Sequence, residues 1–472
     1  MLFNSIDFLV FIICLFAILF IFKKNEQQKW IYLIASYVFY MWWNPALILL
    51  LIFSTTLNYF VGKFIANNLD NIYGKRWLIV GIIINLGMLG FFKYDIFFEN
   101  SFNFISGTSH HSWVSQHIVL PVGISFYTFQ ALSYIIDIYH KKIKPVQSPL
   151  DFFVYKSFFP QLVAGPIVRA SDFLPQLQKE RKIRFETIPV LLVLKGLFKK
   201  IVIADNLGMF TDAVYAKPEN YPSLIIWIAT ISFTIQIYCD FSGYTDIAIG
   251  IAKILGFDFP KNFNKPYFAL TISDFWKRWH ISLSSWLRDY LYIPLGGNKI
   301  SKLITYRNLM ITMLLGGLWH GASWNFVIWG GLHGSLLCIN RWLKVDAIIF
   351  NSKSKIVKLF SWFITMFLVN ILWVIFRITD IGKLKIVLGK FFLFDFNFHI
   401  SDIGIGNLYL FSNLSLIIAF AGIHFYSYRK KEIENVFSTF NNSILFMLIF
   451  IATVVCYFFL PSKEVPFIYF QF

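Results

Sequence analysis

His320 is the side chain whose type and surroundings point most clearly to chemistry. It ends an apolar stretch that begins near Ile304, within the run Gly-Gly-Leu-Trp-His-Gly-Ala-Ser-Trp at 316–324. An ionisable residue inside a membrane-spanning stretch is a functional candidate by default, and the small residues beside it leave room for a substrate. Because burial disfavours the charged imidazole, we expect His320 to be neutral and able to accept a proton, as a general base in acyl transfer must. The alternative is a histidine that bonds to a carbonyl of a neighbouring helix.

His280 lies in a second candidate segment, 275–297, which combines aromatic and charged residues. A charged side chain in the middle of a bilayer costs roughly 2.5–3.5 kcal/mol on insertion scales, so this cluster belongs at an interface or in a polar cavity. The spacing predicts one amphipathic helix that ends at Pro294 and lies in the cytoplasmic headgroup layer or roofs a cavity. Its apolar face carries Trp276, Trp279, Leu283 and Trp286, whereas Lys277, Arg278 and Arg288 largely avoid that face.

Other chemistries have weaker support. His320 and His333 are 13 positions apart, which does not match the i, i+4 spacing of a helical zinc pair, and no Cys or Glu nearby completes a site. We therefore expect no metal. The sequence around the serines lacks the GxSxG turn of a serine nucleophile, and phosphate-binding GxxxxGK[ST] and GxGxxG loops are absent from the sequence.

The composition describes the elements that must position these residues. Of 472 residues, 57% are hydrophobic and 20% aromatic, and the mean hydropathy is +0.63. Charged residues make up 14%, whereas an average soluble domain carries roughly 25%. These values exclude a soluble globular enzyme, a disordered chain and a disulfide-stapled secreted module. They indicate a protein that lies in lipid over most of its length.

The charge pattern gives the expected topology. The 42 Lys and Arg residues outnumber 25 Asp and Glu residues, for a net charge of +17, and they lie in turns between apolar stretches. That arrangement is typical of cytoplasmic loops facing anionic lipid rather than of a nucleic-acid-binding surface. The apolar stretches predict an all-α, polytopic membrane protein with about 11 transmembrane helices, several of them short enough to be re-entrant or broken. Without linkers or internal repeats, 1–472 is expected to form a single multi-pass domain.

Four segments resemble the membrane-bound O-acyltransferase (MBOAT) family, and within it the bacterial alginate and peptidoglycan O-acetyltransferase branch. They are FWKRWHISLSSWLRDYLYIPLGG at 275–297, PVGISFYTFQ at 121–130, FPQLVAGPI at 159–167 and GLWHGA at 317–322. The resemblance covers roughly residues 30 to 345 and is strongest over 118–345.

This resemblance implies a helical fold around a central tunnel that opens to both membrane faces. It makes His320 the catalytic residue at the narrow point of the tunnel, and His280 a functionally required residue on the cytoplasmic side. A cytoplasmic donor such as acetyl-CoA would supply the acyl group as a substrate, with no resident cofactor. The receiver would be a periplasmic hydroxyl or the serine of a partner protein. The resemblance assigns no catalytic role to His333.

Residues and resemblance together give an expected mechanism. His320 would take the proton from an acceptor hydroxyl as it attacks the thioester carbonyl. Trp319, Trp324, Trp276 and Trp279 would wall the tunnel and exclude water. Arg278, Lys277 and Arg288 would meet the phosphates of the donor at the cytoplasmic mouth, or lipid headgroups instead. Asp289 is expected to pair with an arginine.

The acceptor stays open at this point. The branch acts on envelope polysaccharides, including alginate and peptidoglycan, in the bacterial inner membrane. Because the longest outward loop, about 93–117, is short, a separate periplasmic transferase is expected to place the acetyl group on the sugar. The alternatives are D-alanyl transfer to teichoic acid, a scaffold for polysaccharide export, and a proton-coupled secondary transporter with His320 and Asp240 as relays.

Overall fold

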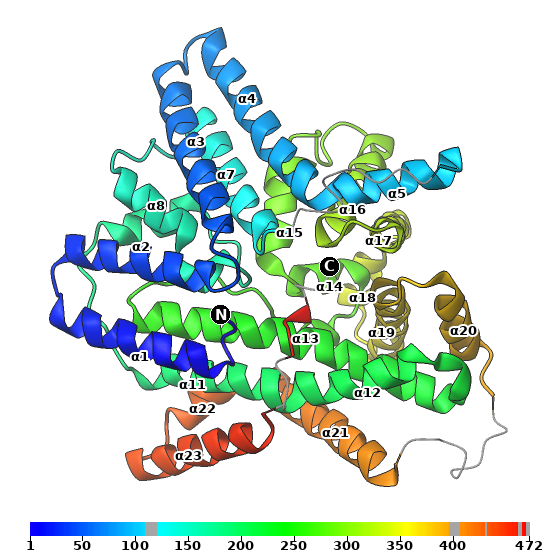
Figure 1. The fold of residues 1–472 in the computed structure, drawn as a ribbon. Helices are drawn as coiled ribbons and strands as arrows, with labels where there is room; N and C mark the ends of the chain where they lie inside the picture. Colours follow the sequence, from blue (N-terminus) through cyan, green and yellow to red (C-terminus); the bar gives the residue numbers. More distant parts are fainter. Residues whose placement is uncertain (109–119, 396–405, 430–431, 461–464, 469–472) are drawn as a thin grey trace. The chain divides into compact units, whose positions relative to one another are not determined.

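In a computed structural model, the chain consists of helices joined by loops in the residues that the structure describes, which are 1–108, 120–395, 406–429, 432–460 and 465–468 (Figure 1). No β-strand occurs within those ranges. The all-α fold class predicted from the composition is therefore confirmed for this part of the chain.

The chain divides into two compact units, and the first consists of residues 1–190 and 248–260. Besides the first residues of α11 and the last turns of α13, it contains α1 (Ile6–Ile21), α2 (Asn25–Met41), α3 (Leu47–Asn67), α4 (Ile72–Leu89), the π-helix η1 (Gly90–Tyr94), α5 (Asp95–Ser106), α7 (Ile124–Tyr139), α8 (Pro149–Ser157), α9 (Phe159–Leu162) and α10 (Ala170–Leu177).

A buried amide pair joins α3 to α4 in this unit. Asn58 Nδ2 donates to Asn85 Oδ1 at 3.0 Å, and Asn85 Nδ2 donates back to Asn58 Oδ1 at 2.8 Å. Both residues are fully buried, and a buried polar group stabilises a fold only when it is hydrogen-bonded. The reciprocal pair therefore fixes the register of two long apolar helices that side-chain hydrophobicity alone leaves free to slide.

The second unit, residues 191–247 and 261–472, holds both candidate histidines. It contains most of α11 (Thr187–Leu197), the π-helix η2 (Phe198–Ala204), α12 (Asp205–Ala216), η3 (Pro218–Asn220), most of α13 (Ser223–Ile254), η4 (Pro266–Phe268), α14 (Ile272–Arg278), α15 (Ile281–Leu287), η5 (Arg288–Tyr292), α16 (Lys302–His320), α17 (Trp324–Trp342), α18 (Val345–Asn351), α19 (Lys355–Arg377), α20 (Ile381–Phe392), α21 (Asn407–Arg429), α22 (Ile433–Phe437) and α23 (Asn442–Phe458).

Small residues bring α16 and α17 into backbone contact. A Cβ atom added at Gly317 would lie 2.2 Å from the carbonyl oxygen of Phe326, and one added at Gly330 would lie 2.3 Å from that of Met313. Only glycine allows these two helices to approach so closely. Gly317, three residues before His320, therefore allows the close packing of α16 on α17, and this packing fixes the position of the histidine at the end of α16.

The prediction of a single amphipathic helix over Trp276–Trp286 is wrong. The structure has α14 and α15 there, separated by Trp279 and His280, and His280 adopts a left-handed backbone conformation with φ of 42°. The Ile281 N–H donates to the carbonyl of Asn262 at 2.8 Å, which holds the chain outside the helical path. A non-glycine residue in this region costs about 1–2 kcal/mol, so tertiary contacts have overridden the local periodicity.

Five helical segments of the described ranges are long and apolar enough to cross a membrane: Leu47–Asn67, Ile72–Ser106, Ser223–Ile254, Lys355–Arg377 and Leu408–Arg429. Ile6–Ile21 and Asn442–Phe458 are shorter apolar helices. Large apolar side chains such as Phe104 and Leu408 are exposed, as on lipid-facing helices. The chain is thus a multi-pass membrane protein, while the count of about 11 spans stays a prediction. The apolar stretch 187–204 is not among the five segments, although α11 continues directly into η2, and it carries Lys195, Lys199 and Lys200.

Candidate active site

His320 is buried among aromatic rings from three helices of the second unit. Its ring centroid lies 5.1 Å from that of Trp319 on α16, 5.2 Å from Trp329 on α17 and 5.5 Å from Phe376 on α19. The histidine is 4% exposed. A low-dielectric surrounding of this kind disfavours the imidazolium and strengthens every polar interaction inside it.

Asn325 holds this group of helices together near His320. Its Nδ2 donates to the carbonyls of Ile375 and Phe376 at 3.3 and 3.2 Å, at the end of α19. The end of α19 is thereby tied to the first turn of α17, so Phe376 is placed by hydrogen bonds as well as by packing. The histidine pocket is consequently built on rigid helices rather than on a loop, which favours precise geometry.

His280 is fully buried, and its orientation is set by one amide. Its Nδ1 lies 3.1 Å from Asn262 Oδ1, which also accepts from Ser282 N and Oγ at 3.2 and 2.8 Å. Because that oxygen can only accept, Nδ1 carries the proton and Nε2 is the acceptor. Burial lowers the pKa of His280 to about 3, so the ring is neutral. Among the described residues, its buried Nε2 has no hydrogen-bond partner.

Trp319 lies between the two histidines. Its ring centroid is 5.1 Å from that of His320 and 5.9 Å from that of His280. The structure therefore brings together the two histidines that the sequence singled out, although 40 residues separate them in the chain. On its other side, His280 packs edge-on against Phe241 at 4.6 Å.

Three buried indoles connect the same region. Trp329, in contact with His320, lies 5.9 Å from Trp373, which in turn lies 4.9 Å from Trp279. Their Nε1 atoms are buried and find no hydrogen-bond partner within the described ranges. A buried N–H without an acceptor is costly, and such donors are what a carbonyl or developing oxyanion of a substrate requires. We call His280, His320, Trp279, Trp319, Trp329, Trp373 and Phe376 the aromatic site.

The other predicted tryptophans of the site, Trp276, Trp279 and Trp324, differ in how deeply they are buried. Trp279 is completely buried, whereas Trp276 is half-buried and donates through Nε1 to Nδ1 of His333 at 3.2 Å. This bond gives the buried His333 a structural role beside the aromatic site. Trp324, by contrast, is 58% exposed, so the structure places it at the surface of the unit and not among the buried rings.

The predicted cations lie in ion pairs. Arg278 Nε bonds to Asp274 at 2.8 Å, and Arg288 Nε bonds to Asp289 at 2.7 Å, which is the arginine pairing predicted for Asp289. The Arg288 side chain is 63% exposed and that of Lys277 is 67% exposed, whereas that of Arg278 is largely covered. Arg288 and Lys277, which pairs with Asp346 at 4.0 Å, are thus exposed enough to contact an anion outside the protein, whereas Arg278 is held in place.

Sequence reasoning missed the segment 465–468, which lies next to this site. Phe467 is buried, with its ring 5.6 Å from Phe241, the residue that packs on His280. The N–H of Ile468 donates to Asp240 at 2.6 Å. The only signal in the sequence is a cluster of aromatic residues after the last apolar stretch, which alone does not distinguish a buried segment from a lipid-facing one.

Asp240 accepts the hydrogen bond from Ile468 in a fixed position, because its carboxylate also forms an ion pair. Lys200 Nζ lies 2.8 Å from Asp240 and 2.7 Å from Asp205, and all three side chains are buried. We call these three residues the ion-pair triad. No group of three or more His, Cys, Asp or Glu side chains suited to a metal occurs in the described part of the chain.

A known family and several known proteins match this chain. The model of the membrane-bound O-acyltransferase family matches residues 142–345, which include both histidines. The chain is 39% identical to the probable alginate O-acetylase of Pseudomonas aeruginosa over 91% of its own length and 82% of that protein. It is 40% identical to the peptidoglycan O-acetyltransferase of Helicobacter pylori, over 78% of its own length and 75% of that protein. A teichoic acid D-alanyltransferase of Streptococcus thermophilus is 29% identical over 51% of this chain and 62% of that protein.

Proposed function

Since this chain belongs to the membrane-bound O-acyltransferase family, and is therefore an acyltransferase, we propose that it transfers an acetyl group from acetyl-CoA for the O-acetylation of an envelope polysaccharide. In this proposal it lies in the bacterial inner membrane, takes the donor from the cytoplasm and passes the acetyl group to the periplasmic side. A periplasmic partner then places the group on peptidoglycan or alginate. The observation that carries the proposal is the pair of buried histidines linked through Trp319.

His320 is the general base in this proposal. It accepts the proton of the acceptor hydroxyl as that oxygen attacks the thioester carbonyl. The tetrahedral intermediate then expels the thiolate of coenzyme A, so the acyl–sulfur bond breaks and the acyl–oxygen bond remains. The thiolate takes the proton from the imidazolium, which returns His320 to its neutral form. The Nε1–H of Trp329, whose ring touches that of His320, is suited to stabilise the negative oxygen of the intermediate.

His280 is a positioning residue in this scheme. Asn262 fixes its tautomer, which leaves Nε2 as a neutral acceptor for an N–H group of the donor. Its low pKa keeps it from taking up the proton released at His320. The two histidines thus have different roles, because only one of them is required to cycle between neutral and charged forms.

The charged side chains near the site support a phosphate-bearing donor. Arg288 and Lys277 are exposed and cationic, so they can meet the phosphates of coenzyme A or of lipid headgroups. Arg278 is held by Asp274 and is better suited to shape the segment that precedes His280. Asp289 orients Arg288 through its ion pair.

Acetylation is favoured over two other functions. The two O-acetylation relatives align over 78–91% of this chain, whereas the D-alanyltransferase relative aligns over about half, so D-alanyl transfer is the second candidate. A transporter that uses Asp240 as a proton relay is disfavoured, because Asp240 is held by contacts with Lys200 and the N–H of Ile468 inside the protein.

The direct test measures ester-linked acetate on the envelope polysaccharides of cells that carry His320→Ala as their only copy. We expect acetate at the level of a deletion strain, with normal amounts of the protein in the membrane. His140→Ala, which removes an exposed histidine, serves as the matched control and should behave as the wild type. Wild-type acetylation in the His320→Ala strain would refute the assigned role, and lost D-alanine esters with normal acetate would favour the second candidate.

A further inference from the structure

A cavity of about 420 Å³ lies in the second unit, separated from the aromatic site by Tyr238 of α13, which lines the cavity and whose ring lies 6.3 Å from that of Trp279. Its walls come from α11, η2, α21, α22 and α23, and neither His280 nor His320 lines it. This volume is within the range of about 300–1,000 Å³ that is usual for ligand pockets. The walls are almost entirely apolar, with side chains such as Phe198, Ile449 and Val455.

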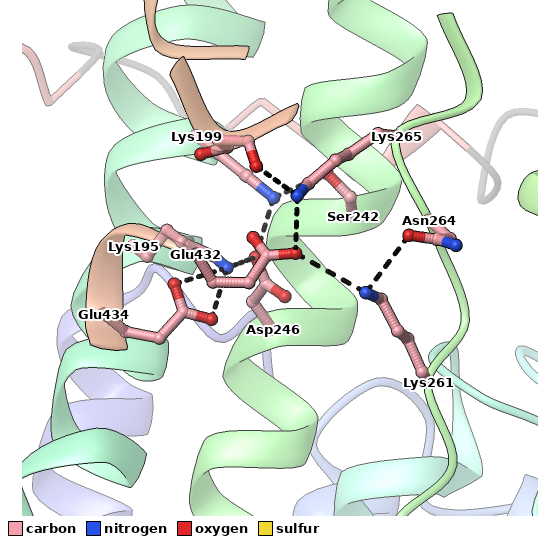
Figure 2. A network of polar contacts seen from close by, with 10 residues as sticks. Lys195, Lys199, Ser242, Asp246, Lys261, Asn264, Lys265, Glu432 and Glu434 are labelled. Carbon is pink, nitrogen blue, oxygen red and sulfur yellow. Dashed lines mark hydrogen bonds and ion pairs between the residues drawn. The ribbon is translucent and has the colours of Figure 1, made fainter. Parts of the chain in front are cut away.

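One end of the cavity is lined by charged side chains, which belong to the network of polar contacts drawn in Figure 2. Lys195 Nζ lies 3.0 Å from both carboxylate oxygens of Glu434 and 3.5 Å from Asp246. Lys199 Nζ lies 2.7 Å from the same Asp246. Two ammonium groups therefore share one carboxylate at this end.

The second half of the charged end repeats that arrangement. Glu432 lies 3.2 Å from Lys265 and 3.5 Å from Lys261 (Figure 2). Burial alone would raise the pKa of Glu432, but Lys195, Lys265 and Lys261 outweigh it and hold the pKa below its usual range. The cluster has four lysines against three carboxylates, so it carries one uncompensated positive charge; its members are Lys195, Lys199, Lys261, Lys265, Asp246, Glu432 and Glu434.

His424 adds an open polar atom to the wall of the cavity. Its ring is stacked between Phe268 and Phe420, with centroids 5.1 and 5.0 Å away, and is thereby held in one orientation. Its Nε2 is buried and has no hydrogen-bond partner among the described residues. A buried polar atom of this kind calls for a partner, which a ligand in the cavity can supply.

The helices that border the cavity expose apolar side chains on their other faces. On α21, Phe411 is 70% exposed and Ile418 is 71% exposed, and on α23, Phe446 is 72% exposed and Phe450 is 62% exposed. In a membrane protein such faces contact lipid tails. The cavity is therefore bordered by helices whose outer faces contact the bilayer.

We propose that this cavity binds a phospholipid, with one acyl chain along the apolar wall, the phosphate at Lys195, Lys199 and Lys265 and the glycerol backbone at His424. An acyl chain matches the apolar wall, and a phosphate diester matches the excess positive charge. The ester or hydroxyl groups next to the phosphate give His424 its hydrogen bond. Phospholipid binding at this site is separate from the proposed acetyl transfer, because it requires neither the acyl donor nor the acceptor.

The test uses the full-length protein, purified and placed in bilayers of phosphatidylcholine, with a phosphatidylglycerol probe that carries a photoreactive diazirine on one acyl chain. Mass spectrometry locates the residues that the probe labels after irradiation. Unlabelled phosphatidylglycerol, diacylglycerol and glycerol phosphate are added as competitors, which separate the contributions of the head group and the chain. The readout is binding alone, so it is independent of whether the protein transfers acetyl groups.

Two substitutions test whether the probe binds in the cavity, and a third is their control. Ala452→Trp fills the cavity from α23, and we expect it to lower labelling about tenfold. Met447→Trp adds the same side chain to the exposed face of α23 and should leave labelling unchanged. His424→Phe keeps the ring and removes the open nitrogen, and we expect about a fivefold loss of probe affinity. Because His424→Phe preserves the packing, it decides the matter if Ala452→Trp does not fold.

We expect labels on the cavity-lining residues of α21 and α23, and competition by phosphatidylglycerol that exceeds competition by diacylglycerol. Labelling that is confined to exposed side chains, or that is equal in wild type, Ala452→Trp and His424→Phe, would overturn the proposal. Equal competition by diacylglycerol would overturn the phosphate assignment. Equal competition by glycerol phosphate would overturn the lipid assignment.

Discussion

The aromatic site and the ion-pair triad are both buried in the second unit, but they treat polar groups in opposite ways. In the triad, Lys200 has a carboxylate at 2.7 Å and another at 2.8 Å. In the aromatic site, Nε2 of His280 and the indole nitrogens of Trp279, Trp329 and Trp373 have no partners among the described residues. Buried polar atoms that the protein leaves without a partner are candidates for contacts with a substrate, whereas paired charges contribute to the stability of the fold. We therefore expect changes in the triad to affect stability and changes in the aromatic site to affect activity.

The largest expected effect follows from Lys200→Met. It leaves the buried carboxylates of Asp205 and Asp240 without their counter-charge, which should destabilise the protein by about 3–5 kcal/mol. Thermal unfolding in detergent measures the loss. Lys141→Met breaks the exposed pair with Asp70 and should change stability by about 1 kcal/mol or less. Equal melting temperatures of Lys200→Met and wild type would mean that the triad does not stabilise the protein.

Trp329→Phe should act on activity instead. It keeps a ring against His320 but removes the open N–H, and loss of one oxyanion donor typically lowers kcat about 10²–10³-fold. The melting temperature should fall only by the cost of the smaller ring in a buried position, since no protein hydrogen bond among the described residues is lost. Trp227→Phe removes an equally buried, unpartnered N–H that stacks on Phe391, so it is the matched control and should retain full activity. Parallel losses in both variants would mean that the rings, and not the nitrogen near His320, matter.

The segment 465–468 joins the two regions, since Ile468 bonds to Asp240 and Phe467 packs on Phe241 beside His280. Removal of residues 465–472 should lower kcat about 100-fold, because small displacements of positioned groups have effects of that size. Melting should fall by less than in Lys200→Met. The measurement is acetyl transfer by the purified, folded variant. Full activity without the segment would confine the site to the helices α14–α19.

The effect that is smallest over a single pH unit concerns acid stability. The pKa of His280 is lowered from 6.5 to about 3 by burial, so between these values the unfolded chain binds a proton that the folded protein excludes. Stability should therefore fall as the pH drops from about 6.5 to about 3, by at most about 1.4 kcal/mol per pH unit from this residue. Denaturation midpoints of wild type and His280→Gln across that range give the difference. An identical acid slope in both proteins would mean that His280 is solvated or charged in the fold.

The sequence indicated the candidate histidines but not their immediate surroundings. His280 and His320 stand in Trp- and Gly-rich runs that are unusual in a membrane segment, so residue type alone marked them. The break at His280 was not predictable, because it depends on Asn262, 18 residues earlier, and the local spacing suits a continuous helix. Lys195 and Glu434 are 239 residues apart, and such long-range ion pairs have no local signal.

Exposure was equally hard to predict. Trp324 shares the motif of His320, yet it lies at the surface, because the chain turns at Gly321 between α16 and α17. Trp329 and Trp373, which do face His320 or its neighbours, lie outside the motif and reach the site through helix packing. Motif membership therefore identified the segment, and the tertiary contacts decided which of its rings are buried.

The central claim is that His320 takes the proton of the acceptor hydroxyl, and one measurement tests it directly. Purified wild type and His320→Gln, each reconstituted with its periplasmic partner, are given radiolabelled acetyl-CoA and a polysaccharide acceptor, and the rate of acetyl transfer is recorded. We predict that kcat falls about 10²–10⁴-fold while the KM for acetyl-CoA stays within a few fold, because a base is lost and the donor contacts remain. A His320→Gln enzyme that transfers acetyl groups at the wild-type rate would contradict the account.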